Sequence, residues 1–317
     1  MQRGIDSYQA GRFAEAERSF RTFLETIPDD ADAHHLLGVV LYQTGRHEDA
    51  VAHIRKSIDF APENASFQNN LGNVLNDLGR TDEAFDCFTR AVAIDPGVAE
   101  AHNNLGNLLK DRARAEDAFQ HFEHALALNP EYAEAHNNLG NLLAGEGRLD
   151  DAVACFQKTL AIRPDFANAH FNHANVLVEM NRLDAAAAGY HEALKARPDF
   201  AHAHIALGNV LKDRGRPDEA TACYEKALEL RPDDADARNN IGNVLLSQGH
   251  LDQALETFRR SVEIDPDGSG YAKHMVAAIT GETTEMAPAD YVQKLFDAYA
   301  PRFDAISSTS SATPCPN

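Results

Sequence analysis

A repeat of 34 residues limits what this chain can fold into more than any other feature of its sequence. The ten residues from Glu100 to Leu109 return unchanged at Glu134 to Leu143, one period later. A period of this length is typical of supersecondary units that stack into an array. A proline marks the end of each unit, at Pro28, Pro62, Pro96, Pro130, Pro164, Pro198, Pro232 and Pro266.

Each period contains two segments with the apolar spacing of an amphipathic helix. In the second complete unit, the first segment places Phe67, Leu71, Val74 and Leu75 on one side, and the second segment repeats the pattern. A helical hairpin of this size cannot bury its apolar face alone, so neighbouring hairpins must stack. The sequence therefore predicts an all-α solenoid.

The turn between the two helices of a unit carries a residue suited to a left-handed backbone. Glycine takes this conformation without steric cost, and asparagine, as at Asn181, is the next best choice. Ala113 stands at this place in one unit, where we expect strain or an altered turn. The glycines at this position are Gly11, Gly45, Gly79, Gly147, Gly215 and Gly249.

An acidic residue follows three positions after each turn. We expect it to stabilise the start of the second helix, either by capping or by interaction with the helix dipole. These residues are Glu48, Asp82, Glu116, Asp150, Asp184, Asp218 and Asp252.

These residues together resemble the tetratricopeptide repeat, which has the same period. The resemblance is carried by Leu71-Gly72, Leu75, Ala84, Phe88, Ala91 and Pro96 and by their equivalents in the other units. It covers seven complete units in residues 31–268 and a partial unit in residues 1–30, which lacks most of its first helix. It implies a right-handed superhelical solenoid of helical hairpins.

Histidine replaces the large aromatic residue that the family often has early in the first helix. Equivalent side chains in successive repeats lie about 10 Å apart, too far to share one metal ion, whose ligands converge within about 2 Å. We therefore expect helix packing and no metal site. Another histidine, His173, replaces a core leucine and predicts a weaker unit at residues 167–198. The residues of this column are His34, Gln68, His102, His136, His170, His204 and Arg238.

Charge and cysteine spacing exclude several classes of protein. The net charge of −20 repels nucleic acids and anionic membranes, and the chain has no apolar run of about 18 residues that would span a bilayer. Cys87, Cys155 and Cys223 occupy the same place in alternate repeats, roughly 20 Å apart, which excludes disulfides between them. We expect half-buried thiols in a reducing compartment, with Cys315 in the tail, and a cytoplasmic protein.

No catalytic motif or cofactor-binding turn is present in the sequence, so we expect no enzyme activity and no cofactor. Residues 269–306 predict a linker-like helical segment, and residues 307–317 have the composition of a disordered tail. The run from His274 through Thr280-Gly281 to Arg302-Phe303-Asp304 resembles the junction at which such repeats are fused to S-adenosylmethionine-dependent methyltransferases. That resemblance implies a catalytic domain that these residues do not include.

Asparagine recurs on the first helix of most units, although it is a mediocre helix former. With each unit numbered from its first residue (Ala31 in the first complete unit), positions 5, 6 and 9 lie opposite the apolar side of the helix. A plain solvated face would carry Glu, Lys, Arg or Gln, so the repetition indicates a hydrogen-bonding role. Position 6 holds Asn70, Asn104, Asn138, Asn172 and Asn240, and position 9 holds Asn73, Asn107, Asn141, Asn175, Asn209 and Asn243.

Two explanations remain open at this point. In the structural one, each carboxamide bonds to a neighbouring repeat and sets the superhelical pitch, mainly at position 9. In the functional one, position 6 faces a concave groove and its amides bind the backbone of an extended peptide. The arrangement resembles the asparagine ladder in the repeats of O-GlcNAc transferases, which implies sequence-tolerant peptide binding. Leu36 and Ala206 interrupt it.

The sequence therefore predicts a protein-interaction scaffold that binds an extended peptide in the groove. The alternative is the substrate-presenting arm of a larger transferase, either a methyltransferase or a glycosyltransferase of the O-GlcNAc type. Weak self-association through the end repeats is a third possibility. Acidic residues border the groove and predict a neutral to basic ligand, unless they only form a solvated rim; they are Asp77, Glu100, Asp111, Glu134, Glu179 and Asp213.

Overall fold

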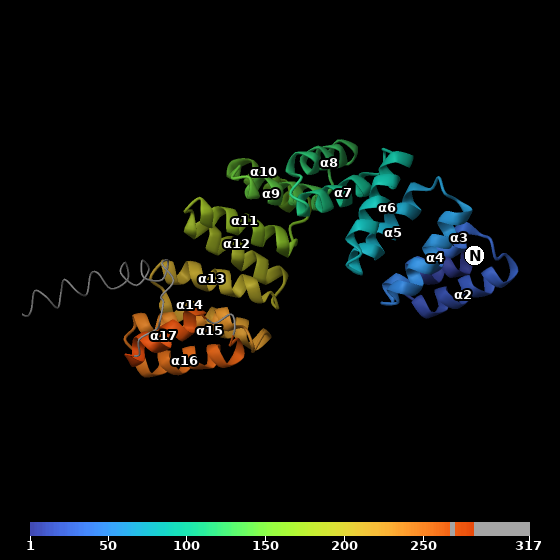
Figure 1. Cartoon of the computed structure of the whole chain (residues 1–317). Helices are drawn as coiled ribbons and strands as arrows, with labels where there is room; N and C mark the ends of the chain where they lie inside the picture. The colour runs from blue at the N-terminus through green and yellow to red at the C-terminus, as the bar shows by residue number, and fades with distance from the viewer. Residues whose placement is uncertain (267–269, 282–317) are drawn as a thin grey trace, which may run out of the picture. The chain divides into compact units, whose positions relative to one another are not determined.

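The computed structural model describes residues 1–266 and 270–281, and over these residues the chain forms seventeen α-helices and no strand. It divides into two compact units, Met1–Met180 and Asn181–Asn317. Within each unit the helices follow one another as antiparallel hairpins (Figure 1). The predicted all-α solenoid is confirmed. The division after Met180 falls inside the repeat in which His173 replaces a core leucine.

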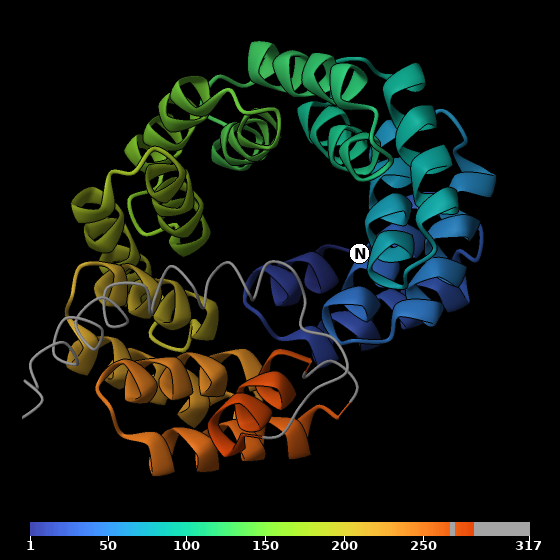
Figure 2. The ribbon, with the colours of Figure 1, turned by 60° about the vertical axis from the view of Figure 1, so that its left-hand side comes forward.

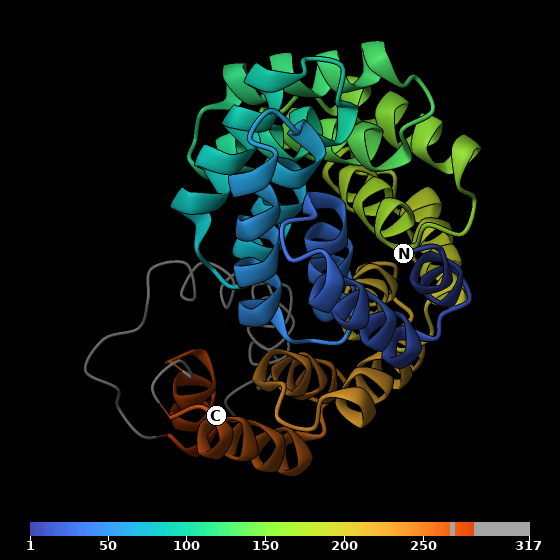
Figure 3. The ribbon, with the colours of Figure 1, turned by 90° about the vertical axis from the view of Figure 1, so that its right-hand side faces the viewer.

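In Met1–Met180 the first helices of the hairpins alternate with the second helices. The first helices are α1 (Gln2–Gln9), α3 (Ala31–Gln43), α5 (Ala65–Asp77), α7 (Ala99–Asp111), α9 (Ala133–Gly145) and α11 (Ala167–Glu179). The second helices are α2 (Phe13–Thr26), α4 (His47–Phe60), α6 (Thr81–Ile94), α8 (Ala115–Leu128) and α10 (Leu149–Ile162). The helix α1 has eight residues, against thirteen in α3, so the first unit keeps more than half of its first helix, whereas the sequence predicted that most of it is missing. The N-terminal hairpins face the viewer in Figure 3.

The second unit continues the same alternation and ends with an additional helix. Its helices are α12 (Leu183–Ala196), α13 (Ala201–Asp213), α14 (Pro217–Leu230), α15 (Ala235–Ser247), α16 (Leu251–Ile264) and α17 (Gly270–Thr280). In α17, Ala272 and Met275 pack against Ala254 and Phe258 of α16, so this helix covers the apolar side of the last repeat. The remainder of the predicted linker, the tail and Cys315 lie outside the described residues.

The two helices of a hairpin approach closely where a glycine of the first helix meets an aromatic ring of the second. A Cβ added to Gly72 would lie 2.5 Å from Cε1 of Phe88, and one added to Gly106 would lie 2.8 Å from Cε1 of Phe122. Both rings are almost completely buried. A larger residue would push the helices apart, which explains the Leu-Gly pair in the repeat.

Left-handed backbone occurs at every predicted turn. The glycines there have φ values between +68° and +84°. Asn181 and Ala113 adopt the same conformation, with φ of 56° and 57°. Of the two outcomes expected for Ala113, the structure therefore shows strain in an unaltered turn.

The acidic residues after the turns are not N-caps and lie in the first turn of the second helix. The residue at the N-cap of the second helices is an arginine in most hairpins, and its side chain makes no capping hydrogen bond. Glu48, Asp82, Glu116 and Asp150 lie in the first turn, where a negative charge is favourable.

Curvature within Met1–Met180 places the first helices on the inner side. Successive first helices, such as α7 and α9, contact each other more closely than successive second helices do. Figure 2 shows α7 and α9 inside α8 and α10.

Among the described residues, every helix is too short or too polar to cross a membrane.

Candidate functional site

The inner face of Met1–Met180 carries the asparagines of positions 5, 6 and 9. Asn104 on α7 donates through Nδ2 to Oδ1 of Asn69 on α5, at 3.1 Å, and to Oδ1 of Asn73, at 2.9 Å. The same step, from position 6 to position 5 of the preceding repeat, joins Asn138 to Asn103 at 2.9 Å. These bonds tie one repeat to the next.

These bonds between position 6 and position 5 of successive repeats form an asparagine ladder, which continues at both ends of this unit. Asn172 donates to Asn137 at 3.3 Å. Asn70 donates to Nε2 of His35 at 2.8 Å, and His35 stands at position 5 in place of an asparagine. Burial lowers the pKa of His35 to about 4, so the imidazole is neutral at neutral pH and Nε2 accepts the bond. Position 6 thus has an inter-repeat role in the structure at Asn70, Asn104, Asn138 and Asn172.

The helix-wheel placement of position 5 was wrong. Asn69, Asn103 and Asn137 are buried, with at most 7% of each residue exposed, although the wheel places them opposite the apolar side. The wheel treats a helix as isolated, whereas in the curved array the next first helix covers this position. The repeated Asn-Asn pair at positions 5 and 6 was the available signal for the ladder.

Position 9 divides into two groups. Asn73 accepts from Asn104, Asn209 accepts from the Tyr224 hydroxyl at 2.8 Å, and Asn243 accepts from the Tyr271 hydroxyl at 2.5 Å. Within the described part of the chain, Asn107 and Asn141 have no protein hydrogen-bond partner, and both are half-buried.

The ladder does not extend through the second unit in the same form. Position 6 holds Ala206 on α13, and Asn240 on α15 follows a repeat whose position 5 is Ile205, which offers no amide oxygen. Asn175 on α11 takes part in an interaction of its own. The candidate amides are therefore brought together mainly by α5, α7, α9 and α11.

The histidine column has the structural role that its spacing predicts. In five repeats, Nε2 donates to the carbonyl oxygen of the proline six residues earlier, at 2.8–3.2 Å. Each bond fastens the first helix to the end of the preceding hairpin. The histidines are His34, His102, His136, His170 and His204, and Arg238 makes the equivalent bond to Pro232.

Metal and thiol chemistry gain no support from the described residues. No group of three or more His, Cys, Asp or Glu side chains among them is arranged to hold a metal ion. Burial raises the pKa of the Cys87 thiol to about 11 and also raises the pKa of Cys155 and Cys223. These thiols are therefore poor nucleophiles at neutral pH.

Comparison with known families assigns the repeat. Models described as tetratricopeptide repeat match residues 1–65 and 205–269, residues 63–131 and 97–165, and residues 143–210, which together reach from residue 1 to residue 269. The chain belongs to the tetratricopeptide repeat family. Tetratricopeptide repeats generally mediate protein–protein interaction, and none of the curated proteins matches this sequence.

Solved structures of other proteins share the tetratricopeptide repeat fold. PilF of Pseudomonas aeruginosa is 23% identical over 65% of this chain and 94% of its own, with a TM-score of 0.59. A chain in the structure of the APC/C hetero-tetramer Cut9–Hcn1 is 18% identical over 84% of this chain and 52% of its own, with a TM-score of 0.65. At these identities the similarity concerns the fold alone.

Proposed function

We propose that this tetratricopeptide repeat protein is an interaction scaffold that binds an extended peptide segment on the inner face of Met1–Met180. The observation that carries the proposal is the pair Asn107 and Asn141. Each is half-buried on a first helix, and neither has a hydrogen-bond partner among the described residues. Neither carboxamide is among the buried unsatisfied polar groups, so both are accessible from solvent and available to bond a ligand.

The spacing of the two amides suits an extended backbone. Equivalent residues of adjacent repeats lie about 10 Å apart, which corresponds to roughly three residues of extended chain at about 3.3 Å per residue. Each carboxamide both donates and accepts, so it matches the N–H and C=O groups of a peptide without reading its side chains. The amides of position 6 are engaged in the ladder, so they position the groove and position 9 binds the peptide.

The acidic residues beside the inner face favour a neutral to basic segment. Several of them already have partners in the protein: Glu134 forms an ion pair with Arg163 at 2.5 Å, Asp111 lies 3.7 Å from Lys110, and Asp77 accepts from the Tyr42 hydroxyl. Glu100, in contrast, is exposed and has no ion-pair partner among the described residues. The preference is therefore for a modestly basic segment, and it should weaken with added salt.

A peptide-display selection tests this proposal. Random extended peptides are selected on the wild-type protein, and the binders are then measured against Asn107→Ala/Asn141→Ala and against Gln120→Ala, an exposed control on α8. Loss of each amide should weaken binding about tenfold, because a lost hydrogen bond in a partly buried site costs about 1–2 kcal/mol. Unchanged affinity in the double variant contradicts the proposal.

The arm of a larger transferase is the second proposal, and the sequence from His274 to Asp304 favours it. Only its first part, through Gly281, lies within the described residues, where α17 covers the last repeat. Sequencing the gene beyond the codon for Asn317 tests this reading. A glycine-rich methyltransferase motif in any frame supports it, and its absence there removes this support.

Self-association through end repeats is tested by light scattering over a range of concentrations, where a constant monomer mass excludes it.

A further inference from the structure

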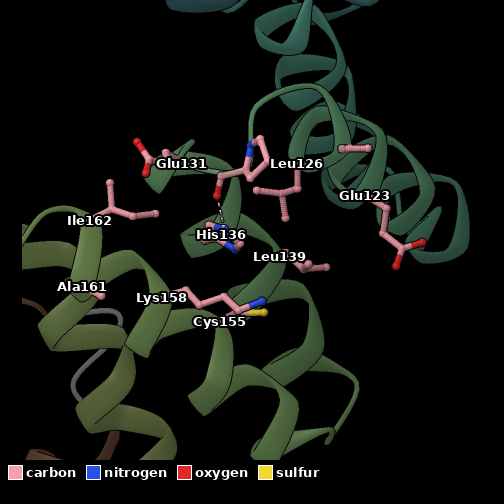
Figure 4. Close-up of a pocket in the computed structure, with 11 residues that line it drawn as sticks. Glu123, Leu126, Glu131, His136, Leu139, Cys155, Lys158, Ala161 and Ile162 are labelled. Atoms are coloured by element: carbon pink, nitrogen blue, oxygen red, sulfur yellow. Dashed lines mark hydrogen bonds between the residues drawn. The ribbon is translucent and has the colours of Figure 1, made fainter.

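A cavity of about 600 Å³ lies among α8, α9 and α10, and its lining does not include the proposed peptide-binding amides. Its walls are mainly apolar, and His136 lies at the centre of the residues that line it, with Cys155 and Lys158 on one side (Figure 4). A cavity of this size accommodates a small molecule or one large side chain. The apolar part of its lining is Leu126, Ala127, Pro130, Leu139, Ala161 and Ile162.

His136 lines this cavity and has a buried, unused hydrogen-bond acceptor. Its Nε2 donates to the carbonyl oxygen of Pro130 at 3.0 Å, so the neutral ring carries its lone pair on Nδ1. The residue is 7% exposed, and its Nδ1 has no hydrogen-bond partner among the described residues. Burial lowers the pKa of His136, with a smaller contribution from the charge of Lys158, so the ring is neutral at neutral pH.

Two other repeats show what is missing at His136. Nδ1 of His34 lies 3.0 Å from Nδ1 of His53, and Nδ1 of His102 lies 3.0 Å from Nδ1 of His121. In each pair the first ring already donates through Nε2 to a proline carbonyl, so the second ring must donate its Nδ1–H. In the repeat of His136 the second histidine is replaced by Cys155, which is smaller and makes no hydrogen bond to Nδ1.

We propose that this cavity binds a planar ring carrying a neutral N–H or O–H donor, such as imidazole or phenol, with the donor on Nδ1 of His136. The ring then occupies the place that a histidine side chain fills in the two other repeats. Lys158 beside the imidazole disfavours a cationic donor, and Glu123 and Glu131 at the rim disfavour an anion. The ring belongs either to a free small molecule or to a tyrosine or histidine side chain of a partner protein.

Titration of the full chain with phenol and with toluene tests the donor. The two probes have nearly the same size and shape, and binding is followed by the methyl NMR signals of Leu126, Leu139 and Ile162. Phenol should bind about two- to tenfold more tightly than toluene, which is the effect of one net hydrogen bond. Equal affinities, or shifts that avoid these methyl groups, overturn the proposal.

The chain itself supplies the templates for two matched variants. Cys155→His recreates the pair that His102 and His121 form, so it should fold and weaken phenol binding at least tenfold by occupying Nδ1 of His136. His136→Gln reproduces the natural combination of Gln68 with Cys87, and it should remove the preference for phenol over toluene. Undiminished phenol binding in Cys155→His contradicts the proposal.

Two short peptides that differ only in Tyr against Phe distinguish the source of the ring. Preferential binding of the tyrosine peptide, lost in Cys155→His, assigns the site to a partner side chain. Exclusion of both peptides while phenol binds assigns it to a free small molecule. Both outcomes support a donor site at His136, whereas a phenylalanine peptide that binds as tightly as the tyrosine peptide argues against it.

Discussion

Alanine substitution at Asn104 and at Asn107 separates the ladder amides from the free amides. The two residues lie three positions apart on α7, and both are half-buried, so the change in helix propensity and in side-chain size is the same. They differ in their partners. Asn104 donates to Asn69 and Asn73, whereas Asn107 has no hydrogen-bond partner among the described residues.

The expected magnitudes follow from these contacts. Asn104→Ala leaves the buried Oδ1 of Asn69 without its donor, which costs about 1–3 kcal/mol, and it gains about 0.5 kcal/mol of helix propensity. The net loss of unfolding free energy is therefore about 0.5–2.5 kcal/mol. Asn107→Ala has only the gain, so its stability should rise by about 0.5 kcal/mol.

Urea unfolding followed by circular dichroism measures both variants against the wild type. Repeat arrays do not always unfold in one step, so the midpoint of the first transition is compared together with the slope. A midpoint for Asn104→Ala equal to or above that of Asn107→Ala refutes the assignment of position 6 to the ladder. Peptide binding should respond in the opposite order, because Asn107 is the amide proposed to contact the ligand.

Three further predictions concern a turn, a helix contact and buried histidines. Ala113→Gly should raise the unfolding free energy by about 1 kcal/mol by relieving the left-handed backbone, and an unchanged urea midpoint would show that the turn is not strained. Gly106→Ala should lower the unfolding free energy by about 1–3 kcal/mol through overpacking. Gly145→Ala, with open space around its Cα, should raise the unfolding free energy by up to about 1 kcal/mol. Similar values for both variants would exclude overpacking. Stability should decline as the pH falls from about 6.5 toward 4, because burial lowers the folded-state pKa of three histidines to about 4 and the unfolded chain then binds more protons. The three histidines are His35, His53 and His121. A urea midpoint that does not change between pH 7 and pH 5 would contradict this prediction.

Local sequence was sufficient to predict the hairpins and their turns. The apolar spacing of Phe67, Leu71 and Leu75 depends only on the geometry of one helix, and a left-handed turn depends on one residue. Even the exception at Ala113 was predictable, because the period places a left-handed turn there and the Cβ of alanine makes that backbone conformation unfavourable. The division of the chain after Met180 was not predicted, since no composition change or linker marks it.

The roles of the asparagines were not predictable from one helix. The sequence left two readings open, bonds between repeats mainly at position 9 and ligand binding at position 6. The structure gives inter-repeat bonds to Asn104 and Asn138 and leaves Asn107 and Asn141 without partners among the described residues. The difference depends on which side chain of the preceding repeat lies opposite each amide. That relation requires the curvature between repeats, which a helix wheel does not contain.

The two identical ten-residue segments show the same dependence on neighbours. His102 in the first copy and His136 in the second have the same sequence around them, and both donate to a proline carbonyl. The hydrogen bonding of their Nδ1 atoms nevertheless differs. Nδ1 of His102 bonds to His121, whereas Nδ1 of His136 has no partner among the described residues because Cys155 stands at the equivalent place. Binding properties in such an array therefore arise from the pairing of a constant first helix with a variable second helix. A single exchange, Cys155→His, is expected to convert one environment into the other without changing the fold.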